Sequence, residues 1–318
     1  MKHKILCTDG FAEAGLTELK KSASLDVVFE RSLSHEDLIK KVPSFDGLIV
    51  RSASTVSRDV IEAGKNLKIV VRAGVGTDNI DIGAATKHGV LVANAPAGNA
   101  TSAAELTFAM ILSLARWIPQ AASSMAEGEW EKKKFQGVEL AGKTVGIIGL
   151  GRIGRAVAKR AIAFNMNIVG FDPFISREQL ESLGVEHLPK EDIFKKADFI
   201  TFHTPLTDET KNMVTLDELK TMKKTAYLVN CARGGIINEH DLAVALKEGL
   251  IAGAALDVFT KEPYKEEIFR KLENCITTPH LGASTHDAQE AVAIEAALVV
   301  TKFFDEGLSI NALNKLSN

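Results

Sequence analysis

Short apolar runs alternate with amphipathic stretches along the first third of this chain. The apolar runs predict buried strands at Ile5–Cys7, Asp26–Phe29, Gly47–Val50, Lys68–Val71 and Gly89–Val92. The stretches between them resemble helices, with examples at Glu13–Lys20, Ser34–Lys41 and Ser57–Ala63. Regular alternation of strand and helix predicts a parallel sheet with helices on both faces.

The same alternation resumes in the second half of the chain. Strands are predicted at Thr144–Ile148, Asn167–Phe171, Asp198–His203, Ala226–Cys231, Ala252–Val258 and Cys275–Thr278. Helices are predicted near Lys190–Lys196, Leu216–Met222 and His240–Glu248. A final amphipathic run, Thr285–Phe304, has no strand after it, so we expect it to dock elsewhere, for instance on the first domain.

Two interruptions divide the chain of 318 residues. The stretch Asn94–Asn99 breaks the pattern before a long helix that starts at Ser102, and a second break falls near Ala283. We therefore predict an α/β protein with two doubly wound parallel-sheet domains, residues 1–97 with 284–318 and the inserted residues 98–283. The cleft between two such domains is the expected ligand site.

A glycine-rich turn follows the strand Thr144–Ile148. It reads Gly149-Leu150-Gly151-Arg152-Ile153-Gly154, opens a helical run, and is followed by a strand that ends at Asp172. Glycines permit a tight turn and close approach of a pyrophosphate, and the helix N-terminus offers unpaired N–H groups. Strand, turn, helix, strand and acid together predict a Rossmann dinucleotide site. An ordinary βαβ turn that binds nothing is the alternative.

Asp172 lies where an acidic side chain accepts hydrogen bonds from the adenosine ribose. Its charge would repel a 2′-phosphate, so the sequence predicts NAD rather than NADP. A solvated aspartate before Pro173 is the alternative.

Three polar side chains follow later strands, where open α/β sheets bind ligands. Arg233, flanked by glycines, suits a carboxylate because its planar fork binds two oxygens; a surface ion pair is the alternative. His280 is a candidate base because the imidazole pKa lies near neutral pH, but His203 and His286 also fall near strand ends. Glu262 is predicted to orient a histidine and raise its pKa, although alone it is typical of a solvated loop acid.

Composition narrows the class of partner. The formal net charge of −3 gives no general attraction to nucleic acid or to an anionic membrane, so an anionic substrate needs local cations. Three cysteines form no disulfide or metal-ligand pattern, which suits a reducing cytoplasm and predicts no metal. The apolar stretch Ala103–Ala115 contains Glu105 and is shorter than the ~20 residues of a membrane span.

Four motifs in this order complete a family pattern: GLGRIG at 149–154, CARGG at 231–235, DVFTKEP at 257–263 and PHLGAST at 279–285. With them the chain resembles the D-isomer-specific 2-hydroxyacid dehydrogenases over nearly its whole length. The resemblance implies a Rossmann NAD domain inserted in a flavodoxin-like substrate domain. It also implies that Arg233, Glu262 and His280 form a catalytic triad.

Within that family the chain looks most like the members that oxidise 3-phospho-D-glycerate to 3-phosphohydroxypyruvate, the first step of L-serine biosynthesis. The stretches RSAS at 51–54, RAGVGTDNID at 72–81 and WEKKKF at 130–135 support this likeness. The resemblance implies NAD contacts from Gly149, Gly151, Arg152, Ile153, Gly154, Asp172, Thr204, Cys231, Ala232, Asp257, Gly282 and Ala283. It implies contacts to a small anionic substrate from Arg51, Arg72, Gly74 and Asn99.

One departure keeps other functions open. Asn99 is followed by Ala100, where the family often has Ser or Thr. The alternatives are another D-2-hydroxyacid dehydrogenase, such as a glyoxylate/hydroxypyruvate reductase or D-lactate dehydrogenase, and an NAD-sensing interaction protein like the family's corepressors.

The family also implies a homodimer through the cofactor domain, for which the apolar helix from Ser102 is a candidate contact. Because the chain ends at Asn318, where longer relatives carry regulatory domains, feedback control by serine is not expected.

Overall fold

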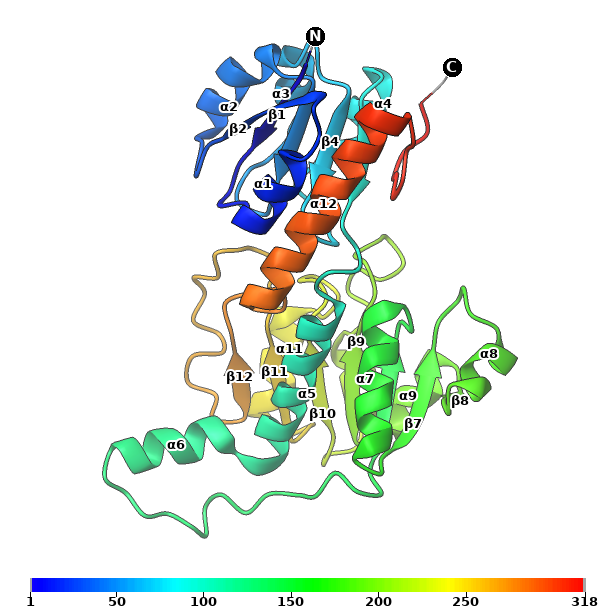
Figure 1. The fold of residues 1–318 in the computed structure, drawn as a ribbon. Coiled ribbons are helices and arrows are strands. Elements are labelled where there is room, and N and C mark those ends of the chain that lie inside the picture. Colours follow the sequence, from blue (N-terminus) through cyan, green and yellow to red (C-terminus); the bar gives the residue numbers. More distant parts are fainter. Residues whose placement is uncertain (1, 317–318) are drawn as a thin grey trace. The chain divides into compact units, whose positions relative to one another are not determined.

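The computed structural model describes residues 2–316, which form two compact units (Figure 1). Unit 1 contains residues 2–100 and 283–316, and unit 2 is the continuous segment Thr101–Gly282. The sequence predicts breaks after residues 97 and 283, whereas the structure divides the chain after residues 100 and 282. No described helix is long and apolar enough to cross a membrane.

Unit 1 is built on a five-stranded parallel sheet in the order β2-β1-β3-β4-β5, which is the flavodoxin-like order. Its strands are β1 (His3–Cys7), β2 (Leu25–Phe29), β3 (Gly47–Val50), β4 (Ile69–Arg72) and β5 (Leu91–Asn94). Its helices are α1 (Glu13–Leu19), α2 (His35–Lys41), the short η1 (Val42–Ser44), α3 (Arg58–Ala63), α4 (Ile82–Lys87) and α12 (His286–Glu306).

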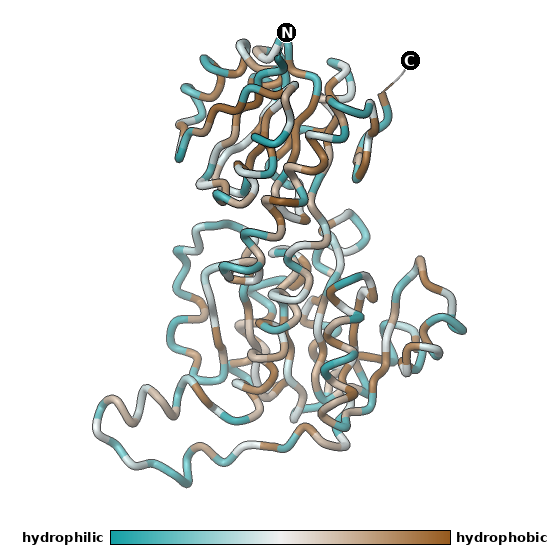
Figure 2. The backbone as a smooth tube through the Cα atoms, viewed as in Figure 1, coloured by the Kyte–Doolittle hydropathy of each residue, from teal (hydrophilic) through white to brown (hydrophobic). Residues whose placement is uncertain are grey.

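Apolar side chains cover both faces of the unit 1 sheet. All four residues of β3 are buried, as expected for a central strand of a parallel sheet, and the strands of this unit are mostly apolar in Figure 2. One face packs against α1 and α12, through side chains such as Leu16 and Val292, and the other against α2, α3 and α4. The C-terminal helix therefore completes the core of the N-terminal sheet, where it lies beside α1 (Figure 1).

Unit 2 is built on a seven-stranded parallel sheet in the order β12-β11-β10-β9-β6-β7-β8. Its strands are β6 (Thr144–Ile148), β7 (Asn167–Phe171), β8 (Glu186–His187), β9 (Phe199–Phe202), β10 (Tyr227–Asn230), β11 (Gly253–Leu256) and β12 (Cys275–Thr277). Its helices are α5 (Ala100–Arg116), α6 (Ile118–Ala126), α7 (Arg152–Ala163), α8 (Arg177–Ser182), α9 (Lys190–Lys196), α10 (Leu216–Thr221) and α11 (Glu239–Lys247). The strand order runs from β6 to β8 on one side of the sheet and from β9 to β12 on the other, so the topological switch point lies between β6 and β9. Ligands bind at such switch points.

The predicted α/β class with two doubly wound parallel sheets is confirmed. The elements that the sequence did not predict are β8, η1, α4, α6 and α8. All are short, and α8 has a single buried residue, Leu180, so its apolar periodicity is weak. Its start depends instead on a capping box formed by Ser176 and Gln179.

The apolar side chains of α5 belong to the core of unit 2. Phe108, Ile111 and Leu114 are all buried within that core, so they are not available for contact with a second subunit. Exposed apolar side chains lie instead in α6 and the segment after it, which project from the body of unit 2 (Figure 1). They are Ile118, Met125, Trp130 and Val138.

Candidate active site and cofactor site

The loops after three neighbouring strands of unit 2 carry the three predicted catalytic residues. Arg233 follows β10, Glu262 follows β11 and His280 follows β12. These strands are adjacent and parallel, so their carboxyl ends lie at one edge of the sheet. Open α/β sheets bind their ligands at this edge.

Glu262 and His280 form a hydrogen-bonded pair. His280 Nδ1 lies 2.7 Å from Glu262 Oε2, and Glu262 Oε1 accepts a hydrogen bond from the Phe259 N–H at 3.0 Å. The hydrogen bond to Glu262 raises the pKa of His280, although partial burial opposes the rise. Burial would raise the pKa of Glu262, but the hydrogen bonds from His280 and Phe259 outweigh it and the pKa is lowered. The side chain of His280 is 47% exposed, so the ring remains accessible to a ligand.

Asp257, buried just after β11, holds the backbone around His280. Its carboxylate accepts hydrogen bonds from Thr278 Oγ1 at 2.6 Å and from the N–H groups of Leu281 and Gly282 at 2.7 and 2.8 Å. The His280 N–H donates to Asp257 O at 2.9 Å. These bonds keep His280 at a φ of 55°, in the left-handed region that few residues other than glycine adopt. Backbone held in this way is typical of functional sites.

A tight turn fixes Arg233 beside this pair. Asn230 donates to Arg233 O at 2.8 Å and accepts a hydrogen bond from the Ala232 N–H at 3.0 Å. A Cβ on Gly234 would lie 1.9 Å from the Phe259 carbonyl carbon, so only glycine lets this loop pack against the loop after β11. After the larger effects named above, the charge of Arg233 also lowers the pKa of Glu262 and opposes the rise at His280.

The other two histidine candidates have different surroundings. Burial lowers the pKa of His203 to about 3, and its Nε2 lies 3.2 Å from Thr201 Oγ1. His286 is the first residue of α12 and belongs to unit 1. His280 is the candidate that is hydrogen-bonded to a carboxylate, that of Glu262.

The glycine turn has the close contacts that its sequence implies. Gly149 has a φ of 93°, and a Cβ there would lie 2.6 Å from His203 O. A Cβ on Gly154 would lie 2.1 Å from Gly149 O, so the start of α7 packs directly on the turn. Gly151 is the N-cap of α7, and apart from the adjoining residues of the chain no atom lies within 4 Å of its Cβ position, so space is open at the helix N-terminus.

Asp172 and Thr204 border this turn and fit a dinucleotide. Asp172 Oδ2 accepts a hydrogen bond from the Leu150 N–H at 2.8 Å, and Oδ1 accepts one from the Phe174 N–H at 2.9 Å. Each oxygen keeps a lone pair for a ribose hydroxyl. Thr204 Oγ1 is buried and has no hydrogen-bond partner among the described residues. A buried hydroxyl without a partner and an open helix N-terminus are features that a bound dinucleotide would satisfy.

The remaining cofactor candidates have mixed surroundings. Burial raises the pKa of Cys231 to about 12, and its Sγ lies 3.4 Å from Met110 Sδ, so the thiol is not a nucleophile. Gly282 O accepts a hydrogen bond from Ser102 Oγ at 2.9 Å, and Ala283 begins the second segment of unit 1. Among residues 2–316, no group of three His, Cys, Asp or Glu side chains is arranged to hold a metal ion.

The predicted substrate residues lie at the carboxyl edge of the unit 1 sheet. Arg51 follows β3, Arg72 ends β4, and Val50 pairs with Arg72 across the two strands. A Cβ on Gly74 would lie 2.5 Å from Arg72 Nη1, so glycine leaves room for the guanidinium. Asn99 follows β5, and its Oδ1 is buried without a hydrogen-bond partner in the described part of the chain.

Sequence reasoning missed the residues that shape the Arg51 loop. Asp9 accepts hydrogen bonds from the N–H groups of Arg51 and Ser54 at 2.8 and 2.9 Å, and from Ser54 Oγ at 2.6 Å. Asn79 donates to Arg51 O at 2.7 Å and to Ser54 O at 2.6 Å. Asp9-Gly10 is a turn signal, but no local pattern connects it with a loop after another strand.

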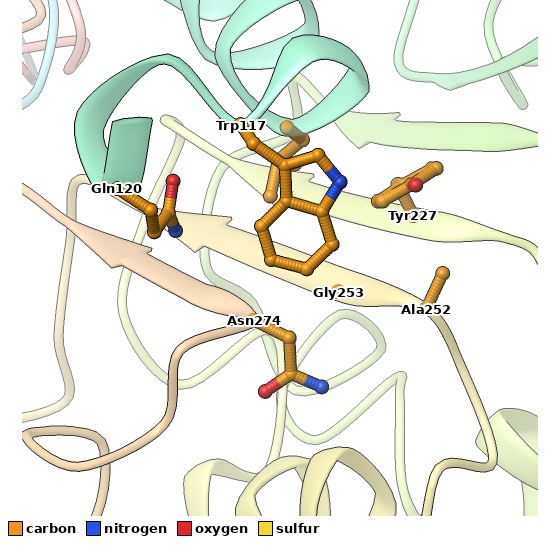
Figure 3. Close-up of a pocket in the computed structure, with 7 residues that line it drawn as sticks. Trp117, Gln120, Tyr227, Ala252, Gly253 and Asn274 are labelled. Carbon is orange, nitrogen blue, oxygen red and sulfur yellow. The ribbon is translucent and has the colours of Figure 1, made fainter. Parts of the chain in front are cut away.

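The cavity in Figure 3 lies at the opposite edge of the unit 2 sheet. It is lined by Leu114, Trp117, Gln120, Tyr227, Ala252, Gly253 and Asn274. Tyr227 and Gly253 are the first residues of β10 and β11, whereas the catalytic candidates follow the ends of these strands. The cavity volume is about 10 Å³, room for one water molecule, so it is not a substrate site.

The fold and the site together define an NAD-binding domain of the dehydrogenase class. A sequence model described as "D-isomer specific 2-hydroxyacid dehydrogenase, NAD binding domain" matches residues 108–282, more than half of the chain. The chain therefore belongs to the D-isomer-specific 2-hydroxyacid dehydrogenase family, and the segment that matches the NAD-binding model lies within unit 2.

Individual relatives agree with this family. The chain is 48% identical to D-3-phosphoglycerate dehydrogenase of Methanocaldococcus jannaschii, over 98% of this chain and 59% of that protein. It is 50% identical to D-3-phosphoglycerate dehydrogenase of Homo sapiens, over 93% of this chain and 55% of that protein. The chain thus spans little more than half the length of these relatives.

Solved structures support both the fold and the cofactor. NAD-dependent formate dehydrogenase from Staphylococcus aureus, in complex with NAD, is 29% identical with a TM-score of 0.86, over 99% of this chain and 100% of that chain. The predicted family and the predicted cofactor, NAD, are confirmed.

Proposed function

We propose that this protein oxidises 3-phospho-D-glycerate to 3-phosphohydroxypyruvate with NAD, the first step of L-serine biosynthesis. Identities of 48% and 50% with relatives named D-3-phosphoglycerate dehydrogenase support this substrate. The observation that carries the chemistry is the Glu262–His280 pair, 2.7 Å apart in the NAD-binding domain.

His280 takes the proton of the C2 hydroxyl in this proposal. Its Nδ1 faces Glu262, so Nε2 is the nitrogen left for the substrate. The hydroxyl O–H and the C2–H bonds break as the carbonyl forms, and the proton moves to Nε2. When bound, NAD supplies the acceptor for the hydride and its electron pair. Glu262 stabilises the imidazolium, because an adjacent carboxylate favours the charged form.

Arg233 binds the substrate carboxylate in the same proposal. Its guanidinium offers two parallel N–H donors, which match the two carboxylate oxygens. Its neighbours in the loop are held by Asn230 and by the close packing of Gly234. A carboxylate fixed in this way presents the adjacent C2 to His280.

The NAD-binding residues follow from the glycine turn. Gly149, Gly151 and Gly154 admit the pyrophosphate at the N-terminus of α7, which Arg152 and Ile153 begin. Asp172 accepts the ribose hydroxyls and repels a 2′-phosphate, so NAD is preferred over NADP. Thr204, Cys231, Ala232, Asp257, Gly282 and Ala283 complete the proposed contacts.

Unit 1 is the substrate-binding domain in this proposal. Arg51 and Arg72 supply local positive charge for the phosphate, in a chain whose net charge is −3. Gly74 makes room for the Arg72 guanidinium, and the unsatisfied Asn99 Oδ1 accepts a hydrogen bond from the substrate. A dianionic phosphate is thereby distinguished from a neutral hydroxymethyl group.

A substrate panel tests the proposal. NADH or NADPH formation is measured with 3-phospho-D-glycerate, D-glycerate and D-lactate, and the reverse reaction with hydroxypyruvate and glyoxylate. We expect the highest kcat/KM for 3-phospho-D-glycerate with NAD. A higher value for an unphosphorylated acid would reject the substrate and leave the family. NAD binding without turnover of any acid would favour an NAD-sensing interaction protein.

We also propose a cytoplasmic homodimer that binds neither nucleic acid nor membrane. All three cysteines are free thiols, as a reducing compartment requires. The exposed side chains of α6 and its following segment, with Trp130 79% exposed, are the proposed dimer contact. Light scattering should give twice the 34.3 kDa chain mass. Trp130→Asp should shift the protein towards the monomer, and a monomeric unmodified protein would reject the dimer.

A further inference from the structure

The turn between β5 and α5 carries Asn99. The Oδ1 of this residue is buried and has no hydrogen-bond partner among residues 2–316. Buried acceptors are normally paired, so this one indicates a donor from outside the chain, such as a substrate hydroxyl. What holds this turn in place therefore matters for binding.

One carboxylate holds the turn. Glu295 Oε2 accepts hydrogen bonds from the N–H groups of Ala97 and Gly98, at 2.9 and 3.2 Å. A Cβ on Gly98 would lie 2.6 Å from Val292 N, so the backbone of the turn rests directly on α12. Glu295 lies about one helical turn further along the same helix. Contact and hydrogen bonds together fix the residues immediately before Asn99.

The second oxygen of this carboxylate contacts the C-terminal segment. Glu295 Oε1 accepts a hydrogen bond from Asn311 Nδ2 at 3.2 Å, and the same amide group lies 3.3 Å from Asn94 O. Asn94 is the last residue of β5, the edge strand of the unit 1 sheet. Glu295 therefore joins the turn before α5 to the segment that follows α12.

The C-terminal segment covers the exposed edge of β5. Ala312 forms an antiparallel bridge with Ala93, and the Leu313 N–H donates to Val92 O at 2.8 Å. These contacts pair backbone groups that an edge strand would otherwise leave open. The segment is thus bound to the sheet along its backbone as well as through Asn311.

Asn314 provides an internal comparison within this segment. Its Oδ1 accepts a hydrogen bond from the Val92 N–H at 2.8 Å, and its Nδ2 donates to Val90 O and Thr86 Oγ1 at 3.0 and 2.9 Å. Asn314 and Asn311 therefore both bind the segment to the sheet. Of the two, Asn311 is the one bonded to Glu295.

We propose that Glu295 is a positioning residue for the substrate-binding turn, and that through Asn311 the C-terminal segment sets the position of Asn99. The proposal rests on the proposed function where it assigns Asn99 to the substrate. A carboxylate suits this role because both oxygens accept hydrogen bonds. The side chain of a glutamine has a single acceptor oxygen, so that oxygen binds either the turn or Asn311. The glutamine binds both only if the Asn311 amide rotates and loses its hydrogen bond to Asn94 O.

Four variants separate positioning from general stability. Glu295→Gln removes the second acceptor, and Asn311→Gly removes the amide at a φ of 53°, which glycine adopts without strain. Asn314→Ala removes three hydrogen bonds from the same segment. Glu290→Gln makes the same charge change at an exposed position of α12. KM and kcat for 3-phospho-D-glycerate, Kd for NAD, and Tm are measured for each.

We expect Glu295→Gln and Asn311→Gly to raise KM by about three- to tenfold, the effect of one or two lost hydrogen bonds. NAD affinity should stay within about twofold, because the turn lies outside unit 2. Asn314→Ala should lower Tm and leave KM unchanged, and Glu290→Gln should change neither. A rise of KM in Asn314→Ala equal to that in Asn311→Gly would overturn the proposal, because stability alone would explain both.

Amide hydrogen exchange at Ala97 and Gly98 gives a readout that needs no substrate. Glu295→Gln should speed exchange at these two amides relative to Glu290→Gln. Equal exchange in the two variants would overturn the positioning role. If the unmodified protein fails to oxidise 3-phospho-D-glycerate, the proposed function falls, while this exchange measurement still decides whether Glu295 holds the turn.

Discussion

At the scale of the residue, the candidate base depends on one partner. His280 differs from His203 because Glu262 lies 2.7 Å from its Nδ1, whereas burial lowers the pKa of His203 to about 3. A base that works near neutral pH needs a pKa in that range. The partner of the ring, and not the residue type alone, therefore distinguishes the candidate base.

Replacing Glu262 should move the pH dependence of oxidation. The hydrogen bond to Glu262 raises the pKa of His280, and oxidation needs the neutral imidazole, so kcat/KM should rise as pH passes that raised pKa. In Glu262→Gln the pKa of His280 falls, and the rising limb of the pH profile should shift to lower pH. A pH profile that Glu262→Gln leaves unchanged would contradict the pairing of Glu262 with His280.

His280→Asn should lower kcat by about 10²–10⁴-fold while NAD still binds. A loss of kcat in His286→Asn instead of His280→Asn would contradict the assignment of His280 as the base.

Arg51 and Arg72 should decide selectivity for the phosphate. Each charge-assisted hydrogen bond contributes roughly 1.5–3 kcal/mol, about ten- to a hundredfold in affinity. Arg51→Ala and Arg72→Ala should weaken 3-phospho-D-glycerate by that order and leave D-glycerate and NAD nearly unchanged. Steady-state KM values for both acids, at low and high salt, check this. Equal losses for the two acids would show that the arginines serve the fold instead.

At the scale of the element, the site depends on how the loops after adjacent strands pack. The parallel order of β10, β11 and β12 brings three loop starts to one edge. Within that edge, Gly234 lets the loop after β10 touch the backbone of the loop after β11. The strand order thus brings the three loops together, and Gly234 sets the distance between Arg233 and the Glu262–His280 pair.

Gly234→Ala should therefore disturb both stability and catalysis. The new Cβ would lie 1.9 Å from the Phe259 carbonyl carbon and 2.4 Å from Thr260 N, backbone atoms that cannot turn away. Overpacking of this kind costs about 1–3 kcal/mol, which thermal unfolding would measure, and kcat should fall as Arg233 shifts. Gly83→Ala is the control, because its nearest atom is 3.5 Å away and alanine favours α4. Equal behaviour of the two variants would reject this reading of the loops.

At the scale of the whole molecule, the two units differ in how the chain builds them. Unit 2 is one continuous segment with its own apolar clusters on the two faces of its sheet. Unit 1 needs both ends of the chain, since Val292, Ala296 and Val300 of α12 belong to the core beside β1 and β4. Removing the C-terminal helix would expose that core.

Expression of separate segments tests this difference. Residues 101–282 alone should fold and bind NAD, as followed by circular dichroism and a fluorescence titration. Residues 1–100 alone should remain unfolded, because they lack the buried face of α12. Adding residues 283–318 through a short linker should restore folding. Cooperative unfolding of residues 1–100 by themselves would contradict the assigned role of α12.

Much of the architecture could be predicted from the sequence because it depends on near neighbours in the chain. The apolar runs specified most strands to within a residue or two, including β3 and β6, and the glycine turn specified the start of α7. Weakly periodic elements such as α8 were not predicted, because a capping box and one buried leucine give little apolar periodicity. The apolar content of α5 makes this helix a candidate subunit contact on sequence alone, but the fold uses Phe108, Ile111 and Leu114 in the core of unit 2.

The sequence by itself determined the two parallel sheets, the dinucleotide turn and the residue types at the strand ends, because periodicity and motif are local properties. Tertiary structure decided which side chains meet. It paired His280 with Glu262, placed Asp257 under the His280 loop, and placed His203 beside Thr201. It also placed Glu295 against the turn before Asn99, a contact between residues nearly two hundred positions apart. No local pattern encodes such contacts, because they exist only once the sheets have brought distant segments together.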